Sequence, residues 1–176
     1  VVETLLRHGH QVRALVHYNS QGSWGHLREL GQQDQLEVRL GDVTDPYLVR
    51  DLVDGCEVVR HLAALIGIPY SYHAPASYIT TNVGGTLNVL EACRQAVVQR
   101  VVVTSTSEVY GTARYAPIDE AHPLQAQSPY SASKIAADKL AESFFCSYDL
   151  PVVILRPCNT YGPRQSARAV IPTVLV

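Results

Sequence analysis

Helical segments alternate with short, apolar, β-branched segments along the whole chain of 176 residues. Segments that predict strands lie at residues 11–17, 36–40, 57–64, 100–105 and 151–157. Helices are predicted at about 1–8, 25–31, 45–56, 78–97 and 129–148, and loops at 65–77 and 111–127. This order predicts a parallel sheet with helices on both faces, which is a doubly wound α/β domain.

Polar residues follow the predicted strands. Asp42, the pair Ala63–Ala64, the run Ser105–Glu108 and the run Arg156–Asn159 each come directly after an apolar segment. Ligands of such sheets bind at the carboxyl ends of the strands. The sequence therefore predicts that these residues share one binding edge.

Composition excludes several other classes of function. The formal net charge is -2, with no run of like charges, so binding to nucleic acid or to a membrane surface is not expected. No apolar run approaches the ~20 residues of a membrane span, and no signal peptide is visible, which favours a cytoplasmic protein. The four cysteines show no C-x-x-C spacing and the histidines no ligand set, so no metal site is predicted.

The beginning of the chain predicts an incomplete domain. The sequence has no methionine, opens at Val1, and enters in the middle of a helix that Gly9 ends. We expect residues 1–176 to be a dinucleotide-binding domain that is truncated at both ends.

Tyr130 and Lys134 lie four residues apart on a predicted helix, so both project from one face. An ammonium near a phenol favours the phenolate and lowers the phenol pKa. The pair suits the removal of a proton from an alcohol while hydride leaves the same carbon.

Six motifs together resemble one family. They are GDVTD (41–45), HLAA (61–64), TNVGGTLNVLEA (81–92), STSEVYG (105–111), SPYSASK (128–134) and RPCNTYGPRQ (156–165). In this order and spacing they resemble the extended short-chain dehydrogenase/reductase family of sugar-nucleotide epimerases and dehydratases. The resemblance implies a Rossmann-like fold and NAD as cofactor, with NADP possible.

The resemblance also implies a role for each matching residue. The cofactor would be held by Asp42, Val43, Ala63, Ala64, Asn82, Thr104, Ser105, Tyr130, Lys134 and Pro157. The nucleotide-sugar substrate would meet Ser71, Tyr72, Thr106, Asn159 and Arg164. Catalysis would fall to Thr106, Ser107, Glu108, Tyr130 and Lys134.

Three features of the family are not found. Its glycine-rich phosphate-binding turn and first strand would precede Val1, and its C-terminal substrate domain would follow Val176. The acid that usually binds the cofactor ribose is also missing, because Val16 and His17 stand at the end of the second strand. His17 could face a 2′-phosphate, and Asn19 and Ser20 could bond either ribose, so the choice of NAD or NADP stays open.

Glu108 favours a 4,6-dehydratase. Elimination of water across C5–C6 needs a base for the C5 proton, whereas plain epimerisation at C4 does not. Glucose-type dehydratases carry Asp-Glu where this chain has Ser107-Glu108. Ser-Glu resembles the GDP-mannose 4,6-dehydratases, and it also resembles UDP-glucuronate decarboxylases. A decarboxylase, a 4-epimerase and a non-catalytic dinucleotide-binding protein therefore remain alternatives.

The remaining motifs look closest to dehydratases of the legionaminic-acid branch, which act on GDP- or UDP-linked N-acetylhexosamines. In that branch Ser71 and Tyr72 would lie over the hexose. Relatives dimerise through the helices that correspond to 78–97 and 129–148, and a homodimer is expected here. Apolar residues of the second helix that could serve this interface are Ile135, Leu140, Phe144 and Phe145.

Overall fold

The computed structural model describes residues 1–31, 34–162 and 164–165. Its strands are β1 (Val12–His17), β2 (Leu36–Gly41), β3 (Val58–His61), β4 (Arg100–Thr104) and β5 (Val152–Leu155). Its α-helices are α1 (Val2–Arg7), α2 (Pro46–Val53), α3 (Ile68–His73), α4 (Pro75–Tyr78), α5 (Gly85–Ala96) and α6 (Pro129–Tyr148). The fold also has two 3₁₀ turns, η1 (Gly25–Leu30) and η3 (Ser107–Tyr110), and one π-helical turn, η2 (Ile79–Gly84), among the described residues. The predicted alternation of helix and strand is confirmed.

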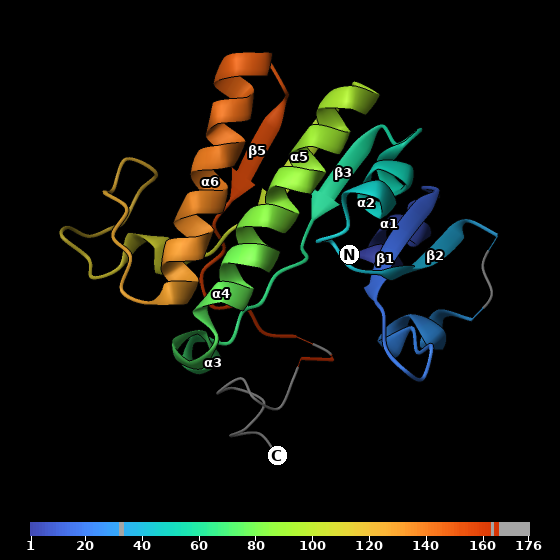
Figure 1. Ribbon diagram of the computed structural model, residues 1–176, viewed down its shortest axis with the longest axis horizontal. Coiled ribbons are helices and arrows are strands. Elements are labelled where there is room, and N and C mark those ends of the chain that lie inside the picture. The colour runs from blue at the N-terminus through green and yellow to red at the C-terminus, as the bar shows by residue number, and fades with distance from the viewer. Residues whose placement is uncertain (32–33, 163, 166–176) are drawn as a thin grey trace.

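All strand pairs are parallel and form two groups. β1 pairs with β2, and β3, β4 and β5 pair in that order. Helices α5 and α6 lie side by side across the second group (Figure 1). The parallel Rossmann-like architecture predicted from the sequence is therefore confirmed, and every strand ends at the same edge.

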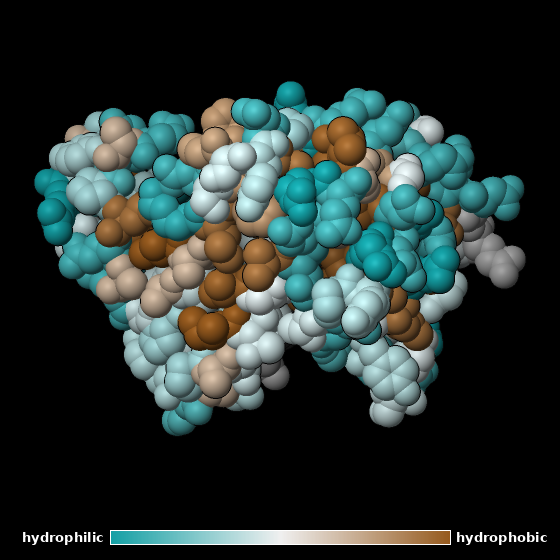
Figure 2. Space-filling model, turned by 45° about the horizontal axis from the view of Figure 1, so that its top comes forward, coloured by the Kyte–Doolittle hydropathy of each residue, from teal (hydrophilic) through white to brown (hydrophobic). Residues whose placement is uncertain are grey.

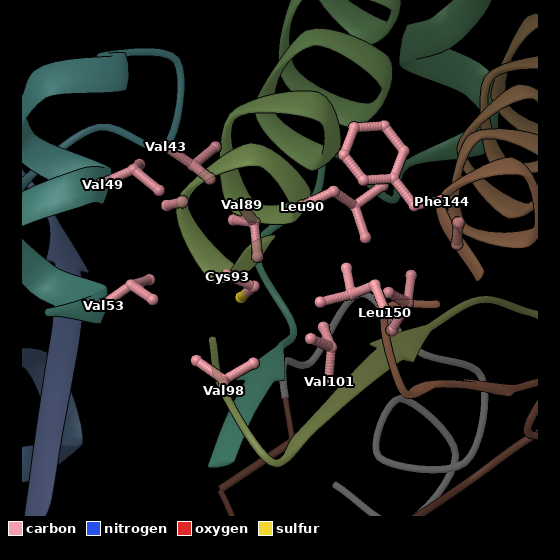
Figure 3. Close-up of a cluster of buried hydrophobic side chains, with 13 residues drawn as sticks. Val43, Val49, Val53, Val89, Leu90, Cys93, Val98, Val101, Phe144 and Leu150 are labelled. Carbon is pink, nitrogen blue, oxygen red and sulfur yellow. The ribbon is translucent and has the colours of Figure 1, made fainter. Parts of the chain in front are cut away.

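One apolar core joins the two groups of strands. Val49 and Val53 of α2 pack toward α5, whose Val89, Leu90 and Cys93 are buried (Figure 3). Val101 and Val103 of β4 belong to the same core and are fully buried. The described strands of the two groups do not pair with one another, and the contact between α2 and α5 is a main link between the groups.

The helix starts follow the sequence signals. The Asp45 carboxylate accepts hydrogen bonds from the backbone N–H groups of Tyr47 and Leu48, at 2.9 and 3.2 Å, and Pro46 opens α2. Ser128 caps α6 in a reciprocal capping box with Ser131, and Pro129 follows it. These caps fix where α2 and α6 begin.

Two predictions differ from the structure. The segment 65–77, predicted as a loop, contains α3 and most of α4, both of which begin with a proline in the first turn. The helix predicted over 78–97 is a π-helical turn at Ile79–Gly84 followed by α5. π-turns insert an extra residue into a helix and are frequent at functional sites. Among the described helices, none is long and apolar enough to cross a membrane.

Val97 offers a test of the backbone at the end of α5. It has a left-handed conformation, with φ of 52°, and its side chain is 83% exposed. A β-branched residue is strained there, so Val97→Gly should raise the free energy of unfolding by roughly 0.5–1 kcal/mol. Ala96→Gly, one residue earlier in the helix, should instead lower it by about 1 kcal/mol. Chemical denaturation measures both, and equal effects of the two substitutions would contradict this assignment.

Candidate active site

The site lies where β3, β4 and β5 end and where helix α6 begins. η3 follows β4 directly and carries Ser107 and Glu108. The Ser107 N–H donates to the Pro157 carbonyl at 3.0 Å, which ties η3 to the chain after β5. Four of the five residues expected to act in catalysis therefore come from two elements that meet at one edge, and the fifth, Thr106, is the N-cap of η3.

Tyr130 and Thr106 face one another. Their side chains form a hydrogen bond, and Thr106 also accepts the Glu108 N–H at 3.2 Å. The Tyr130 ring packs edge-on against Tyr78, with 6.2 Å between centroids. Glu108 remains exposed, and its charge acts on Tyr130. A hydroxyl, a phenol and an open carboxylate are thus gathered at one point.

Burial sets the ionisation of Tyr130. It raises the pKa of the phenol above its usual value, and the Glu108 charge adds to this rise, while the hydrogen bond with Thr106 lowers it. The sequence analysis expected Lys134 to lower this pKa. In the protein alone the net shift is upward, because burial is the largest influence on the phenol and the Glu108 charge acts in the same direction.

Lys134 is 3% exposed, and its ammonium donates to the Thr104 carbonyl at 2.6 Å. Burial lowers the pKa of Lys134, and the charge of Asp138 opposes that shift. Nearby, the Ser105 Oγ is buried without a hydrogen-bond partner among the described residues. An ammonium with N–H groups to spare and an orphaned hydroxyl fit the hydroxyls of a bound ribose.

Asn82 was expected to contact the cofactor, but its side chain is hydrogen-bonded inside the protein. Its side chain is fully buried, and its amide nitrogen donates to the Leu65 carbonyl at 3.0 Å and to the Ser133 Oγ at 2.9 Å. Its amide oxygen accepts the Leu65 N–H at 2.8 Å. With both donors in use, Asn82 clamps the chain after β3 onto α6, and its contact with a cofactor stays a prediction that these bonds do not favour.

The clamp continues through residues that the sequence analysis missed. The Asn82 carbonyl accepts from Thr86 Oγ1 at 2.6 Å, and Thr86 Oγ1 lies 3.0 Å from Nε2 of the buried His61. At the other end, Ser133 Oγ donates to the Tyr130 carbonyl at 2.7 Å. In the sequence these residues look like ordinary helix residues. The feature that could have identified them is a set of small polar residues on the inner faces of α5 and α6.

Arg156 anchors η3 from the side of β5. Its guanidinium donates to Asp138 at 2.9 Å and to the Tyr110 hydroxyl at 3.2 Å. Asp138 is 1% exposed and belongs to α6, so a buried ion pair holds the end of β5, η3 and α6 together.

The other residues expected to bind the cofactor differ in how accessible they are. Asp42 lies beyond β2, and its carboxylate accepts from the Thr44 N–H and hydroxyl, each at 2.8 Å. The Val43 side chain is buried in the core, so only its backbone is available to a ligand. Ala63 is exposed, and Ala64 and Pro157 are partly exposed.

The residues expected to bind the substrate differ in burial and in their hydrogen-bond partners. Ser71 is fully buried and donates to the Ile68 carbonyl at 2.6 Å, so it supports α3 and does not face a hexose. Tyr72 is exposed, with its hydroxyl 3.4 Å from the Gln127 carbonyl, and Asn159 is exposed after β5. Arg164 binds the carboxylates of Glu3 and Glu29 at 2.7 and 3.0 Å, which uses two of its three guanidinium nitrogens, and its contact with a substrate stays a prediction.

Known proteins share these features. A model of the family described as GDP-mannose 4,6 dehydratase matches residues 1–176. The low-salt glycan biosynthesis protein Agl12 of Haloferax volcanii is 39% identical over 132 residues, which are 75% of this chain and 43% of that protein. UDP-glucose 4-epimerase of Mycolicibacterium smegmatis is 37% identical over 167 residues, which are 94% of this chain and 53% of that protein.

The fold matches a solved structure closely. DesIV, a dTDP-glucose 4,6-dehydratase of Streptomyces venezuelae with NAD and TYD bound, superposes with a TM-score of 0.90 at 32% identity. The match covers 98% of this chain and 55% of that one. The chain thus spans about half the length of the proteins it resembles.

Asn82→Ala tests the clamp. It leaves buried groups of Leu65 and Ser133 without partners, so the free energy of unfolding should fall by about 2–4 kcal/mol. Asn88→Ala is the matched control, since it removes one partly buried bond to the Val43 carbonyl, and should cost about 1 kcal/mol. Equal losses in urea denaturation would show that Asn82 is not a clamp.

His61 predicts a pH dependence of stability. Burial, helped by the charge of Lys134, lowers the pKa of His61 from 6.5 to about 4. The unfolded chain therefore binds a proton that the folded chain does not, and stability falls as pH drops from about 6.5 towards 4, with a slope of up to ~1.4 kcal/mol per pH unit. His61→Gln should flatten this part of the stability profile, and an unchanged slope would contradict the assignment.

Proposed function

This chain belongs to the GDP-mannose 4,6-dehydratase family, and we propose that its protein is an NAD-dependent sugar-nucleotide 4,6-dehydratase. The observation that carries the proposal is the grouping of Thr106, Tyr130 and Glu108 at the end of β4. The first two suit the oxidation of an alcohol, and the carboxylate supplies the base that an elimination needs in addition.

The residues of the edge fit the cofactor. Lys134 and Ser105 would hold the nicotinamide ribose, and Thr104 and Pro157 would line the path beside it. Asp42, Ala63, Ala64 and the backbone of Val43 would hold the adenosine half. A nicotinamide cofactor held by these residues would supply the hydride-transfer chemistry that the reaction needs at C4 and C6 of the sugar.

Tyr130 would act as the base for the C4 hydroxyl. Its raised pKa keeps the phenol protonated in the protein alone, so the site needs a positive charge nearby to make the phenolate. Lys134, one turn further along α6, would supply part of this charge together with the bound cofactor. Thr106 bonds Tyr130 and would hold the substrate oxygen in line with it.

Glu108 would carry out the elimination. Once C4 is a ketone, the proton on C5 becomes acidic, and the carboxylate removes it. The C6 hydroxyl then leaves as water and takes up a proton, which Glu108 can return. The exposed position of Glu108 beside Tyr130 gives it access to C5 and C6 of a sugar whose C4 lies at the phenol.

For the substrate we favour a GDP- or UDP-linked N-acetylhexosamine, on the resemblance of the motifs around Ser107-Glu108 and of 65–77. Tyr72 and Asn159 are the expected residues that remain open to it. A dTDP-linked glucose is the competing substrate, since DesIV is described as a dTDP-glucose 4,6-dehydratase.

We also propose a homodimer through η2–α5 and α6. Hydrophobic side chains reach the surface in several places (Figure 2). On these two helices Leu87, Phe145 and Tyr148 are exposed, whereas Phe144 is buried in the core. Of the four apolar residues of α6 expected at this interface, Phe145 is the one that is exposed.

A 4-epimerase is the second candidate. The UDP-glucose 4-epimerase of Mycolicibacterium smegmatis aligns with 94% of the chain. Ser107 also stands where glucose-type dehydratases carry an acid. In that case Glu108 would have no part in the reaction.

Product mass distinguishes these reactions. The full-length protein is incubated with GDP- and UDP-N-acetylglucosamine, dTDP-glucose and UDP-glucuronate. Loss of water supports the dehydratase, loss of carbon dioxide from the glucuronate indicates a decarboxylase, and an unchanged mass with a new stereoisomer indicates an epimerase.

Glu108→Gln tests the role of the carboxylate. Loss of the base should slow dehydration by about 10²–10⁴-fold, while the fold is unaffected because the side chain is exposed. Glu120→Gln is the control, since it removes an exposed acid from the loop 111–127 and should leave the rate unchanged. Dehydration that survives Glu108→Gln at the full rate would remove Glu108 from the mechanism.

A further inference from the structure

The end of β1 carries an ion pair where the ribose of the cofactor is expected. His17 is the last residue of β1 and pairs in register with Gly41 of β2, so Asp42 lies one residue beyond. His17 Nε2 lies 3.0 Å from Asp42 Oδ2, and the two side chains are 78% and 42% exposed. The pair is therefore open to a ligand at the binding edge.

The carboxylate of this pair is already satisfied. Asp42 Oδ1 accepts from Thr44 N and from Thr44 Oγ1, and Oδ2 meets His17. The Thr44 backbone bond is the main reason that the pKa of Asp42 is lowered, and His17 adds to it. Asp42 already accepts two bonds at Oδ1 and one at Oδ2, which leaves it little capacity for a further bond from a ribose hydroxyl.

The Asn19 side chain is used within the loop after His17. Asn19 Oδ1 accepts the N–H groups of Gln21 and Ser23 at 3.2 and 3.0 Å. Its amide nitrogen donates to the carbonyls of Ser23 and His17 at 2.9 and 3.3 Å. The sequence left Asn19 open as a ribose ligand, but its amide is spent on shaping the loop. His17 and Ser20 are exposed polar side chains there, and His17 is the one at the end of the strand.

An imidazole and a carboxylate have opposite effects at this position. A carboxylate binds the 2′-hydroxyl of NAD and repels the 2′-phosphate of NADP. With Nε2 directed at Asp42, Nδ1 of His17 has no partner in the described part of the chain. That nitrogen accepts from a 2′-hydroxyl when the ring is neutral and donates to a phosphate when the ring is protonated.

We propose that His17 sets the cofactor choice of this protein, and that the His17–Asp42 pair makes the site accept NADP as well as NAD. His17 replaces the repelling carboxylate and lies 3.0 Å from the nearest one, Asp42, whose charge a protonated ring offsets. The inference rests on the proposed function only in that the protein must bind a dinucleotide.

Calorimetric titration of the full-length protein with NAD and with NADP, without sugar nucleotide, tests this. The ratio of the two dissociation constants is the readout, so general damage to the site cancels. We expect the unaltered protein to bind the two cofactors within about tenfold of each other. His17→Asp should weaken NADP at least ~10-fold relative to NAD, and His17→Arg should shift the ratio the other way.

His10→Asp is the matched control, because it makes the same change at an exposed residue before the opposite end of β1 and should leave the ratio unchanged. A preference for NAD above ~100-fold in the unaltered protein would overturn the proposal, as would a ratio that neither His17 variant moves. If His17→Asp binds neither cofactor, the His17→Arg ratio decides. Because no turnover is measured, a failure of the dehydratase assignment leaves this result intact.

Discussion

Lys134 places a buried ammonium against the carbonyl end of β4, and the polar interior of the domain is arranged around it. A charge that is 3% exposed needs compensation, which the Thr104 carbonyl and the charge of Asp138 one turn along supply. The same charge helps to keep His61 neutral. A neutral His61 can then join the hydrogen-bond chain through Thr86 to Asn82, so the core beside the site is polar and still largely satisfied.

Helix α6 contacts each of the elements that form this edge of the domain. Four of its residues share an inward face, and each meets a different element. Tyr130 meets Thr106 before η3, Ser133 meets Asn82 in η2, Lys134 meets β4, and Asp138 meets Arg156 after β5. A single capped helix therefore positions Tyr130 and Lys134 relative to every strand end of the larger group, and the capping box at Ser128 fixes where that helix starts.

The differences between expectation and structure have one kind of cause. Asn82 lies in the π-turn at Ile79–Gly84, and its side chain bonds both Leu65 and Ser133. Ser71, expected at the substrate, is fully buried, and burial raises the pKa of Tyr130, which Lys134 was expected to lower. Arg164, expected at the nucleotide, bridges Glu3 and Glu29, and its contact with a nucleotide stays a prediction. In each case a contact distant in sequence decides what a side chain does.

The sequence by itself determined the order of strands and helices, the caps of α2 and α6, the shared edge and the residues gathered there. These depend on periodicity, on capping chemistry and on the common direction of parallel strands, all of which are local or topological. Only the tertiary structure decided which of those residues are free to act. Whether Asn82 or Asp42 can bind a ligand depends on which of its hydrogen bonds the protein already uses, and whether Tyr130 ionises depends on how deeply it is buried. Both are properties of packing between segments far apart in the chain.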